Sequence, residues 1–267
     1  MRLVSFEGGF GRVEGDSVVP MGADLVAYLG GARPQDGAAR AISSLRLLAP
    51  VLRPEKIICV GLNYRDHAAE SGQAVPTEPI LFGKYRNSIV GPGAAISLPR
   101  LAAGEVDYEA ELAVVIGRTA SRVALAQALS YVAGYTCAND VSARDLQNRS
   151  SQWLHGKAID TFLPLGPWIV TADEIPDPQA LRIRCSINGT ELQDSNTNQM
   201  VFGVAELVSF ISQTITLSPG DVISTGTPPG VGAARKPPRY LRAGDLVTVS
   251  VEGIGDLTNP VVAESTR

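Results

Sequence analysis

The chain has 267 residues, of which 45% are hydrophobic and 19% charged, and its formal net charge is −4. This length is enough to bury a large core in one domain or in a domain and a half. The acidic balance argues against a nucleic-acid partner, because such binding needs a surplus of Lys and Arg on the surface that faces the phosphates. No apolar run approaches the roughly 20 residues that cross a bilayer, so we expect no membrane partner either.

The first 50 residues predict short strands, a helix near residues 22–30 and a variable stretch, GGARPQDGAAR. The opening MRLVSFEGGF has no apolar segment of the kind found in secretory signals, so nothing indicates export. The following APVLRPEK, residues 49–56, carries two prolines and is typical of a linker. We therefore divide the chain into a small N-terminal α/β domain over residues 1–52 and a catalytic domain over residues 53–267.

From residue 56 onward, short apolar segments of β type are separated by Gly, Pro and Asn-Gly turns. These segments are KIICVGLNY, ELAVVIG, PWIVT, LRIRCSING, DVISTGT and LVTVSVEGIG. Helical patterns are fewer and fall at about residues 122–130 and 203–213. Strands and helices do not alternate regularly, which argues against a doubly wound sheet. The pattern predicts an α+β, β-rich fold with largely antiparallel strands.

The cysteines bear on the cellular compartment. Cys59, Cys137 and Cys185 are odd in number and widely spaced. This pattern is typical of buried free thiols, rather than of disulfides or a zinc site. We therefore expect a protein of the reducing cytoplasm.

The first polar motif is GLNYRDHAAESG, in which RDHAAE has helical propensity. On a helix His67 and Glu70 stand three residues apart and share one face. A carboxylate beside a histidine orients the ring and raises its basicity, as a general base acting on water requires. The alternative is a capped surface helix on which this pair occurs by chance.

The second motif is DYEAELAVVI, residues 107–116. Side chains alternate across a strand, so Asp107, Glu109 and Glu111 are expected on one face. The alternative is that these three carboxylates form the solvated outer face of an edge strand. Asp140, in ANDVSARDLQ, follows another apolar segment and could complete a site begun by the two glutamates. Oxygen ligands alone would favour Mg²⁺ or Mn²⁺, and possibly Ca²⁺, over zinc.

Further polar residues could bind an acidic substrate. Arg144 and Gln147 follow Asp140 by four and seven residues, so a helix could present the three together. Arg144 is suited to a substrate carboxylate, although a local salt bridge with Asp145 or Glu111 is the alternative. Lys157, in HGKAIDTFLPLGPW, could donate to an enolate or be a surface cation. STGTPPGVG lacks the Walker pattern, and we interpret it as a rigid turn that presents the Thr227 hydroxyl and nearby amides.

Taken together, these motifs resemble the fumarylacetoacetate hydrolase superfamily. GLNYRDHAAE, DYEAELAVVIG, NDVSARDLQ, GKAIDTFLPLGP, SINGTELQDSNT and LSPGDVISTGTPPGVG occur in the family's order between about residues 57 and 255. The resemblance implies a mixed β-sandwich roll, usually a homodimer, with Mg²⁺ or Mn²⁺ held by carboxylates. It places the metal ligands at Glu109, Glu111 and Asp140, the water-activating pair at His67 and Glu70, the lysine at Lys157, and the substrate contacts at Arg144, Gln147 and Thr227.

The chain departs from the family pattern in two places, of which the first points toward the shorter, acylpyruvate-type branch and away from the eukaryotic namesake. The namesake carries one more metal-binding Asp seven residues before its histidine, where this chain has Val60. The acylpyruvate members commonly have a proline after the lysine that corresponds to Lys84, whereas this chain reads FGKYRN. The second departure concerns the loop that selects the substrate.

Three functions are compatible with these residues. The first is hydrolysis of a C–C bond in a 2,4-diketo acid, in which the cation chelates the carboxylate and 2-oxo oxygens and His67 activates water. Lys157 would help to stabilise the departing pyruvate enolate. The second is decarboxylation of an oxaloacetate-like acid, or isomerisation or hydration of a 2-hydroxydienoate. The third is metal-dependent ligand binding without turnover, against which the His67–Glu70 pair argues.

Overall fold

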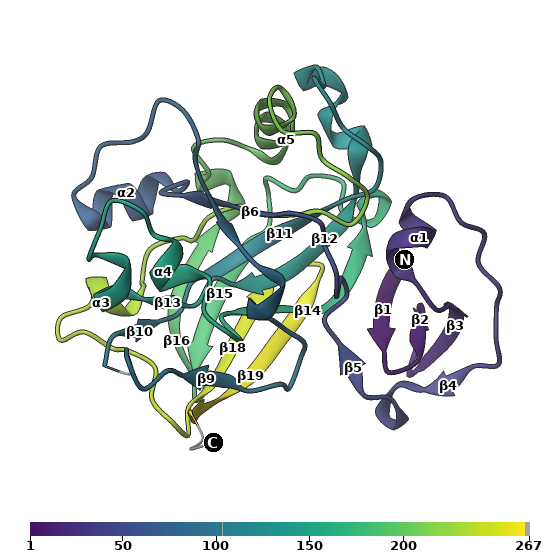
Figure 1. The fold of residues 1–267 in the computed structure, drawn as a ribbon, viewed down its shortest axis with the longest axis horizontal. Helices are drawn as coiled ribbons and strands as arrows, with labels where there is room; N and C mark the ends of the chain where they lie inside the picture. The colour runs from purple at the N-terminus through teal and green to yellow at the C-terminus, as the bar shows by residue number, and fades with distance from the viewer. Residues whose placement is uncertain (103, 265–267) are drawn as a thin grey trace.

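The computed structural model describes residues 1–102 and 104–264, and most of its elements are strands (Figure 1). Twelve strands form one large sheet in the order β4-β3-β2-β1-β14-β12-β11-β17-β6-β7, with β5 beside β1 and β8 beside β14. They are β1 (Arg2–Phe6), β2 (Gly9–Glu14), β3 (Ser17–Gly22), β4 (Arg40–Ala41), β5 (Leu47–Leu48), β6 (Ile57–Gly61), β7 (Ile80–Lys84), β8 (Ile89–Val90), β11 (Ala110–Ile116), β12 (Val132–Asn139), β14 (Leu163–Thr171) and β17 (Val222–Ser224).

A second sheet of five strands packs against the large one. Its order is β16-β15-β18-β19-β9. The bounds are β9 (Ile96–Leu98), β15 (Arg182–Ile187), β16 (Thr190–Asn196), β18 (Leu246–Val251) and β19 (Gly255–Ala263). A short pair, β10 (Val106–Asp107) with β13 (Ser142–Ala143), lies apart from both sheets. The predicted β-rich α+β fold is thus confirmed, and most pairings are antiparallel.

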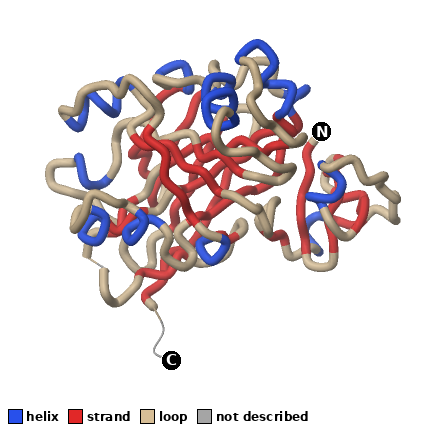
Figure 2. The backbone as a smooth tube through the Cα atoms, turned by 45° about the horizontal axis from the view of Figure 1, so that its top comes forward, coloured by secondary structure: helices blue, strands red, loops and turns tan. Residues whose placement is uncertain are grey.

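The helices are short and lie mainly around the strands (Figure 2). The α-helices are α1 (Leu25–Leu29), α2 (Arg65–Ser71), α3 (Arg144–Gln147), α4 (Leu154–Lys157) and α5 (Val204–Ser212). The 3₁₀ turns are Ile42–Ser44, Arg86–Ser88, Leu125–Tyr131, Ala172–Glu174, Thr197–Gln199 and Gly232–Ala234. The helix expected near 122–130 is therefore a 3₁₀ helix, whereas those near 22–30 and 203–213 are α-helical. No helix in the described ranges is long and apolar enough to span a membrane.

The core explains why β11 has so continuous an apolar sequence. Leu112 and Val114 belong to the cluster that contains the inner residues of β15 and β18, such as Cys185. The alternate residues Ala113 and Val115 belong to a second cluster on the other face of the large sheet. A strand buried on both faces has no solvated side, so the run of apolar residues replaces the usual alternation. The charged residues at its start are therefore also enclosed.

The N-terminal strands continue the large sheet. Arg2 and Leu3 of β1 pair with Val170 and Ile169 of β14. Figure 1 shows β1–β3 and α1 as a lobe on the right, beside the other strands of the large sheet. The boundary at residues 52 and 53 stays a prediction, and hydrogen bonds of the large sheet cross it.

Candidate active site

Three carboxylates meet where β11 begins and β12 ends. Antiparallel pairing sets Glu111 opposite Ala138, and the Asp140 amide donates to the Glu109 carbonyl over 2.9 Å. One oxygen from each of Glu109, Glu111 and Asp140 lies within 4.8 Å of the others, and all three residues are buried. The strand pairing thus brings together the residues that the sequence predicted as metal ligands.

Three cations surround this cluster. Lys157 Nζ lies 2.7 Å from Glu109 Oε2 and 2.8 Å from Asp140 Oδ2. Lys84 Nζ lies 2.7 Å from Asp140 Oδ1, and Arg144 Nη1 lies 2.7 Å from Glu109 Oε1. A buried carboxylate without such partners would cost several kcal/mol, so the cations are what allow the cluster to be enclosed.

The neighbouring charges shift the pKa values of the two glutamates in opposite directions. Burial would raise the pKa of Glu109, but Lys157 and Arg144 outweigh it and lower that pKa to about 2. Burial, followed by the negative charges of Asp140 and Glu109, raises the pKa of Glu111 well above its usual range. Burial would lower the pKa of Lys157, yet Asp140 and Glu109 raise it, so this lysine is a cation and not a free amine.

The donor set fits a hard divalent cation. The three ligands are carboxylates, which Mg²⁺ and Mn²⁺ favour over zinc. Of the buried side-chain oxygens in the described ranges, Asp140 Oδ1 is one of the few without a hydrogen-bond partner, so its close contact with Lys84 is an ion pair only. Because Lys84 lies against this oxygen, the fit rests on the donor set and on the spacing of the three ligand oxygens within 4.8 Å. Glu109, Glu111 and Asp140 can therefore bind a divalent ion.

The predicted histidine pair is formed on α2. His67 Nδ1 lies 3.0 Å from Glu70 Oε2 across one helical turn, and both side chains are partly exposed. Glu70 Oε1 accepts from the backbone N–H of Gly230 over 2.8 Å. Because Nδ1 is engaged, Nε2 is the ring nitrogen left to exchange a proton with a substrate.

His67 of the pair and Glu109 and Glu111 of the cluster line one cavity of about 110 Å³. Its polar lining includes the predicted residues His67, Glu109, Glu111, Arg144, Gln147, Lys157 and Thr227. Trp153 and Phe82 form an apolar part of the lining, with their rings edge to face at 5.5 Å. Gly61 allows this arrangement, because an added Cβ would lie only 2.3 Å from the Trp153 ring.

Comparisons with known proteins agree with this geometry. A family model described as "Fumarylacetoacetate (FAA) hydrolase C-terminal" matches residues 56–262. The chain belongs to this hydrolase family. It is 53% identical over 222 residues to "Oxaloacetate tautomerase fahd2, mitochondrial" of Xenopus laevis, which covers 82% of this chain and 69% of the relative.

Two solved structures of the fumarylacetoacetate hydrolase fold match nearly the whole chain. The 2-hydroxyhepta-2,4-diene-1,7-dioate isomerase of Mycobacterium marinum is 39% identical, with a TM-score of 0.86 and coverage of 100% of both chains. The fumarylacetoacetate hydrolase of Exiguobacterium antarcticum is also 39% identical, with a TM-score of 0.90 and coverage of 99% of this chain and 100% of the other. Enzymes with this fold thus carry names for different reactions.

Within this family member, the strand expected over residues 107–116 is interrupted. Asp107 ends β10 and β11 begins only at residue 110, so the three acids do not share one face of a single strand. Asp107 instead binds Arg144 and accepts from the backbone N–H groups of Gly232 (2.7 Å) and Ala233 (3.0 Å). A change of sheet at this point, which residue alternation cannot reveal, separates Asp107 from the ligands.

The structure does not place Asp140 on one helix with Arg144 and Gln147, as the sequence predicted. Asp140 precedes β13 and lies outside α3, which begins at Arg144. Arg144 pairs with Asp107 and Glu109, rather than with either of the acids suggested by the local salt-bridge alternative. Its Nη1 also donates to Gln147 Oε1 over 3.0 Å. Most of its donors are therefore already engaged within the protein, and its role toward a substrate carboxylate stays a prediction.

The turn after β17 directs its amides inward. Gly226 N donates to Glu111 Oε2 over 2.9 Å, and Gly230 N donates to Glu70. Thr227 Oγ1 lines the cavity and accepts from Gln193 Nε2 over 2.8 Å. The expectation that nearby amides are presented to a substrate is wrong for these two, because the protein's own carboxylates accept from them.

Several residues of the site were not predicted. Lys84 carried one signal, since it is one of only four lysines and lies in an apolar segment. Gln193, Trp153 and Tyr108 carried none, because their neighbours in space come from distant parts of the chain. Gln193 is buried and joins Ala110 N to Thr227 and the Pro228 carbonyl.

Proposed function

We propose that this enzyme interconverts the keto and enol forms of a small 2-oxo acid of the oxaloacetate class. Decarboxylation of such an acid and isomerisation of a 2-hydroxydienoate are related reactions of the same site. The observation that carries the proposal is that His67, which contacts Glu70, lines one small cavity together with Glu109, Glu111 and Lys157. The names of the Xenopus and Mycobacterium relatives support this choice over C–C bond hydrolysis.

The carboxylate side would bind the acid. A divalent ion held by Glu109, Glu111 and Asp140 would act as a Lewis acid toward the 2-oxo oxygen. Lys157 lies beside two of these carboxylates and keeps its positive charge. Its ammonium group stabilises negative charge that develops on the substrate oxygen. The low polarity contributed by Phe82 and Trp153 strengthens this interaction.

The histidine side would move the proton. His67 Nε2 takes a proton from C3 of the acid while Glu70 stabilises the ring through Nδ1. The electron pair of the C3–H bond forms the C2=C3 double bond, and the oxygen on C2 takes up a proton from solvent. His67 then releases its proton to solvent, so that one proton leaves and one arrives. The reverse sequence converts the enol into the ketone.

Hydrolysis of an acylpyruvate is the second candidate. The same pair would deprotonate a water that attacks the 4-carbonyl, and the departing enolate would use the same cation and Lys157. The likeness to the solved Exiguobacterium fumarylacetoacetate hydrolase favours this candidate. The two functions therefore differ in what His67 deprotonates, carbon in one and water in the other.

The test follows hydrogen exchange and product formation together. The protein with Mg²⁺ or Mn²⁺ is incubated in D₂O with oxaloacetate, acetylpyruvate, fumarylpyruvate or a 2-hydroxydienoate, and products are followed by proton NMR and mass. We expect accelerated keto–enol exchange of oxaloacetate, with Asp140→Asn as the inactive control. Rapid acylpyruvate cleavage without such acceleration would replace the first candidate with the second.

We also propose, from the family resemblance, that the protein is a homodimer, which light scattering at micromolar concentration would test. A monomer would refute it. The cytoplasmic location stays a prediction, since the Xenopus relative is named as mitochondrial. The absence of a nucleic-acid partner likewise rests on the charge balance alone.

A further inference from the structure

The His67–Glu70 pair depends on a peptide group far away in the sequence. The N–H of Gly230 donates to Glu70 Oε1 over 2.8 Å, while Glu70 Oε2 contacts His67 Nδ1 at 3.0 Å. One peptide therefore fixes the carboxylate that in turn fixes the ring. Because α2 has only two turns, its own backbone bonds restrain this carboxylate little.

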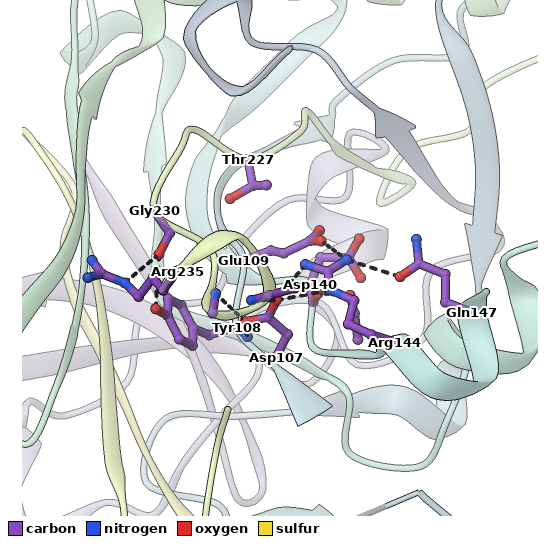
Figure 3. Close-up of polar contacts among 12 residues, drawn as sticks. Asp107, Tyr108, Glu109, Asp140, Arg144, Gln147, Thr227, Gly230 and Arg235 are labelled. Atoms are coloured by element: carbon purple, nitrogen blue, oxygen red, sulfur yellow. Dashed lines mark hydrogen bonds and ion pairs between the residues drawn. The ribbon is translucent and has the colours of Figure 1, made fainter. Parts of the chain in front are cut away.

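The carbonyl of the same residue, which belongs to the next peptide group, is held by the core. The Gly230 carbonyl accepts from the Tyr108 hydroxyl over 2.9 Å and from Arg235 Nε over 3.3 Å (Figure 3). Tyr108 is fully buried and lies in the break between β10 and β11, directly before the metal ligand Glu109. Gly230 has φ +98°, and an added Cβ would lie 2.1 Å from the Leu192 carbonyl, so the residue packs tightly against that backbone.

We propose that Tyr108 is a positioning residue for the general base, acting through residue Gly230 and Glu70. The inference rests on the proposed function of the His67–Glu70 pair. The two bonds belong to successive peptide groups that meet at the Gly230 Cα, so donation to the carbonyl anchors Gly230 from one side and holds its N–H in place to bind Glu70 on the other. Since Tyr108 and Glu109 are consecutive, one short length of backbone sets both the proton-transfer side and the metal side of the cavity.

The first test is a double-mutant cycle. Tyr108→Phe removes the hydroxyl and leaves the buried ring, so kcat should fall about three- to tenfold, the value of one hydrogen bond, with KM and metal affinity unchanged. In the Glu70→Gln background the same substitution should lower kcat less than about twofold, because the carboxylate that links Gly230 to His67 is already missing. Tyr135→Phe, which removes a second buried tyrosine hydroxyl, should leave kcat unchanged. Equal losses in both backgrounds would overturn the inference.

The second test needs no turnover. The chain has only two histidines, so ¹⁵N imidazole spectra contain signals of His67 and His155 alone, and His155→Asn assigns them. Tyr108→Phe should shift or broaden the His67 signals, and Tyr135→Phe should not. Unchanged His67 signals in Tyr108→Phe would refute the positioning role. If these signals respond in a protein that shows no keto–enol activity, the proposed function fails while the positioning role stands.

Discussion

The two sides of the cavity are built differently. The carboxylates lie where the paired strands β11 and β12 meet their flanking loops, are almost fully buried and have cationic partners on several oxygens. The His67–Glu70 pair lies on a two-turn helix, and its side chains are 15% and 24% exposed. A buried, charge-compensated cluster is costly to disturb, whereas a partly exposed pair can be altered at small cost in stability. Cation binding and proton transfer should therefore be separable by mutation.

The largest effect is expected on the carboxylate side. Asp140→Asn removes one negative ligand and leaves Lys84 and Lys157 with less compensation, so metal affinity should fall more than about 100-fold and activity should be lost. Glu109→Gln should act in the same direction. Calorimetric titration with Mn²⁺ measures the affinity. Asp194→Asn, at an exposed carboxylate, is the matched control, and wild-type affinity in Asp140→Asn would remove that residue from the ligand set.

The next largest effect is expected on the histidine side, where a substitution should slow proton transfer without weakening metal binding. Glu70→Gln weakens the base, so proton transfer from carbon or water should slow by roughly 10²-fold, the usual contribution of a general base. Metal affinity should hardly change, because neither member of the pair contacts the carboxylates. Decarboxylation of oxaloacetate, which needs mainly an electron sink, should fall much less. Equal losses in all reactions would mean that the pair positions the substrate and is not the base.

A smaller effect is expected on metal affinity and proton transfer together, from a residue that is linked to both sides of the cavity. Asp107 holds Arg144, which binds Glu109, and also the amides of the segment that supports Glu70. Asp107→Asn keeps the shape but removes the charge, so metal affinity and kcat should each fall about tenfold, the lower end for outer-shell partners of a metal. Both are measured on the same preparation. A change in only one of them would show that Asp107 serves one side alone.

The same contrast explains what could be predicted from the sequence. The candidate ligands Glu109 and Glu111 are close in sequence, as are His67 and Glu70, so residue spacing together with the family resemblance was enough to predict them. Asp140 followed from its place after an apolar segment. The β-rich fold and the short helices followed from turn residues and apolar patterns.

Residues that join distant segments were beyond such reasoning. Lys84 reaches Asp140 from another strand, and Tyr108 reaches Gly230 across 122 residues of chain. The break between β10 and β11 is equally hidden, because Asp107 belongs to the local alternation but changes sheet. These features arise from tertiary packing, which overrides the local pattern.

The smallest effect tests the apolar wall that both sides share. In Gly61→Ala the new Cβ would lie 2.3 Å from the Trp153 ring, so the ring must move. Overpacking of this kind costs about 1–3 kcal/mol, which should lower Tm by several degrees, and the displaced ring should raise KM while metal affinity stays unchanged. Gly83→Ala on the neighbouring strand is the control, since its nearest neighbour would be the Ile57 carbonyl at an ordinary 3.6 Å. Trp153→Leu in the Gly61→Ala background should restore Tm, because a smaller side chain removes the clash. A normal KM in Gly61→Ala would show that Trp153 lines the cavity without touching the substrate.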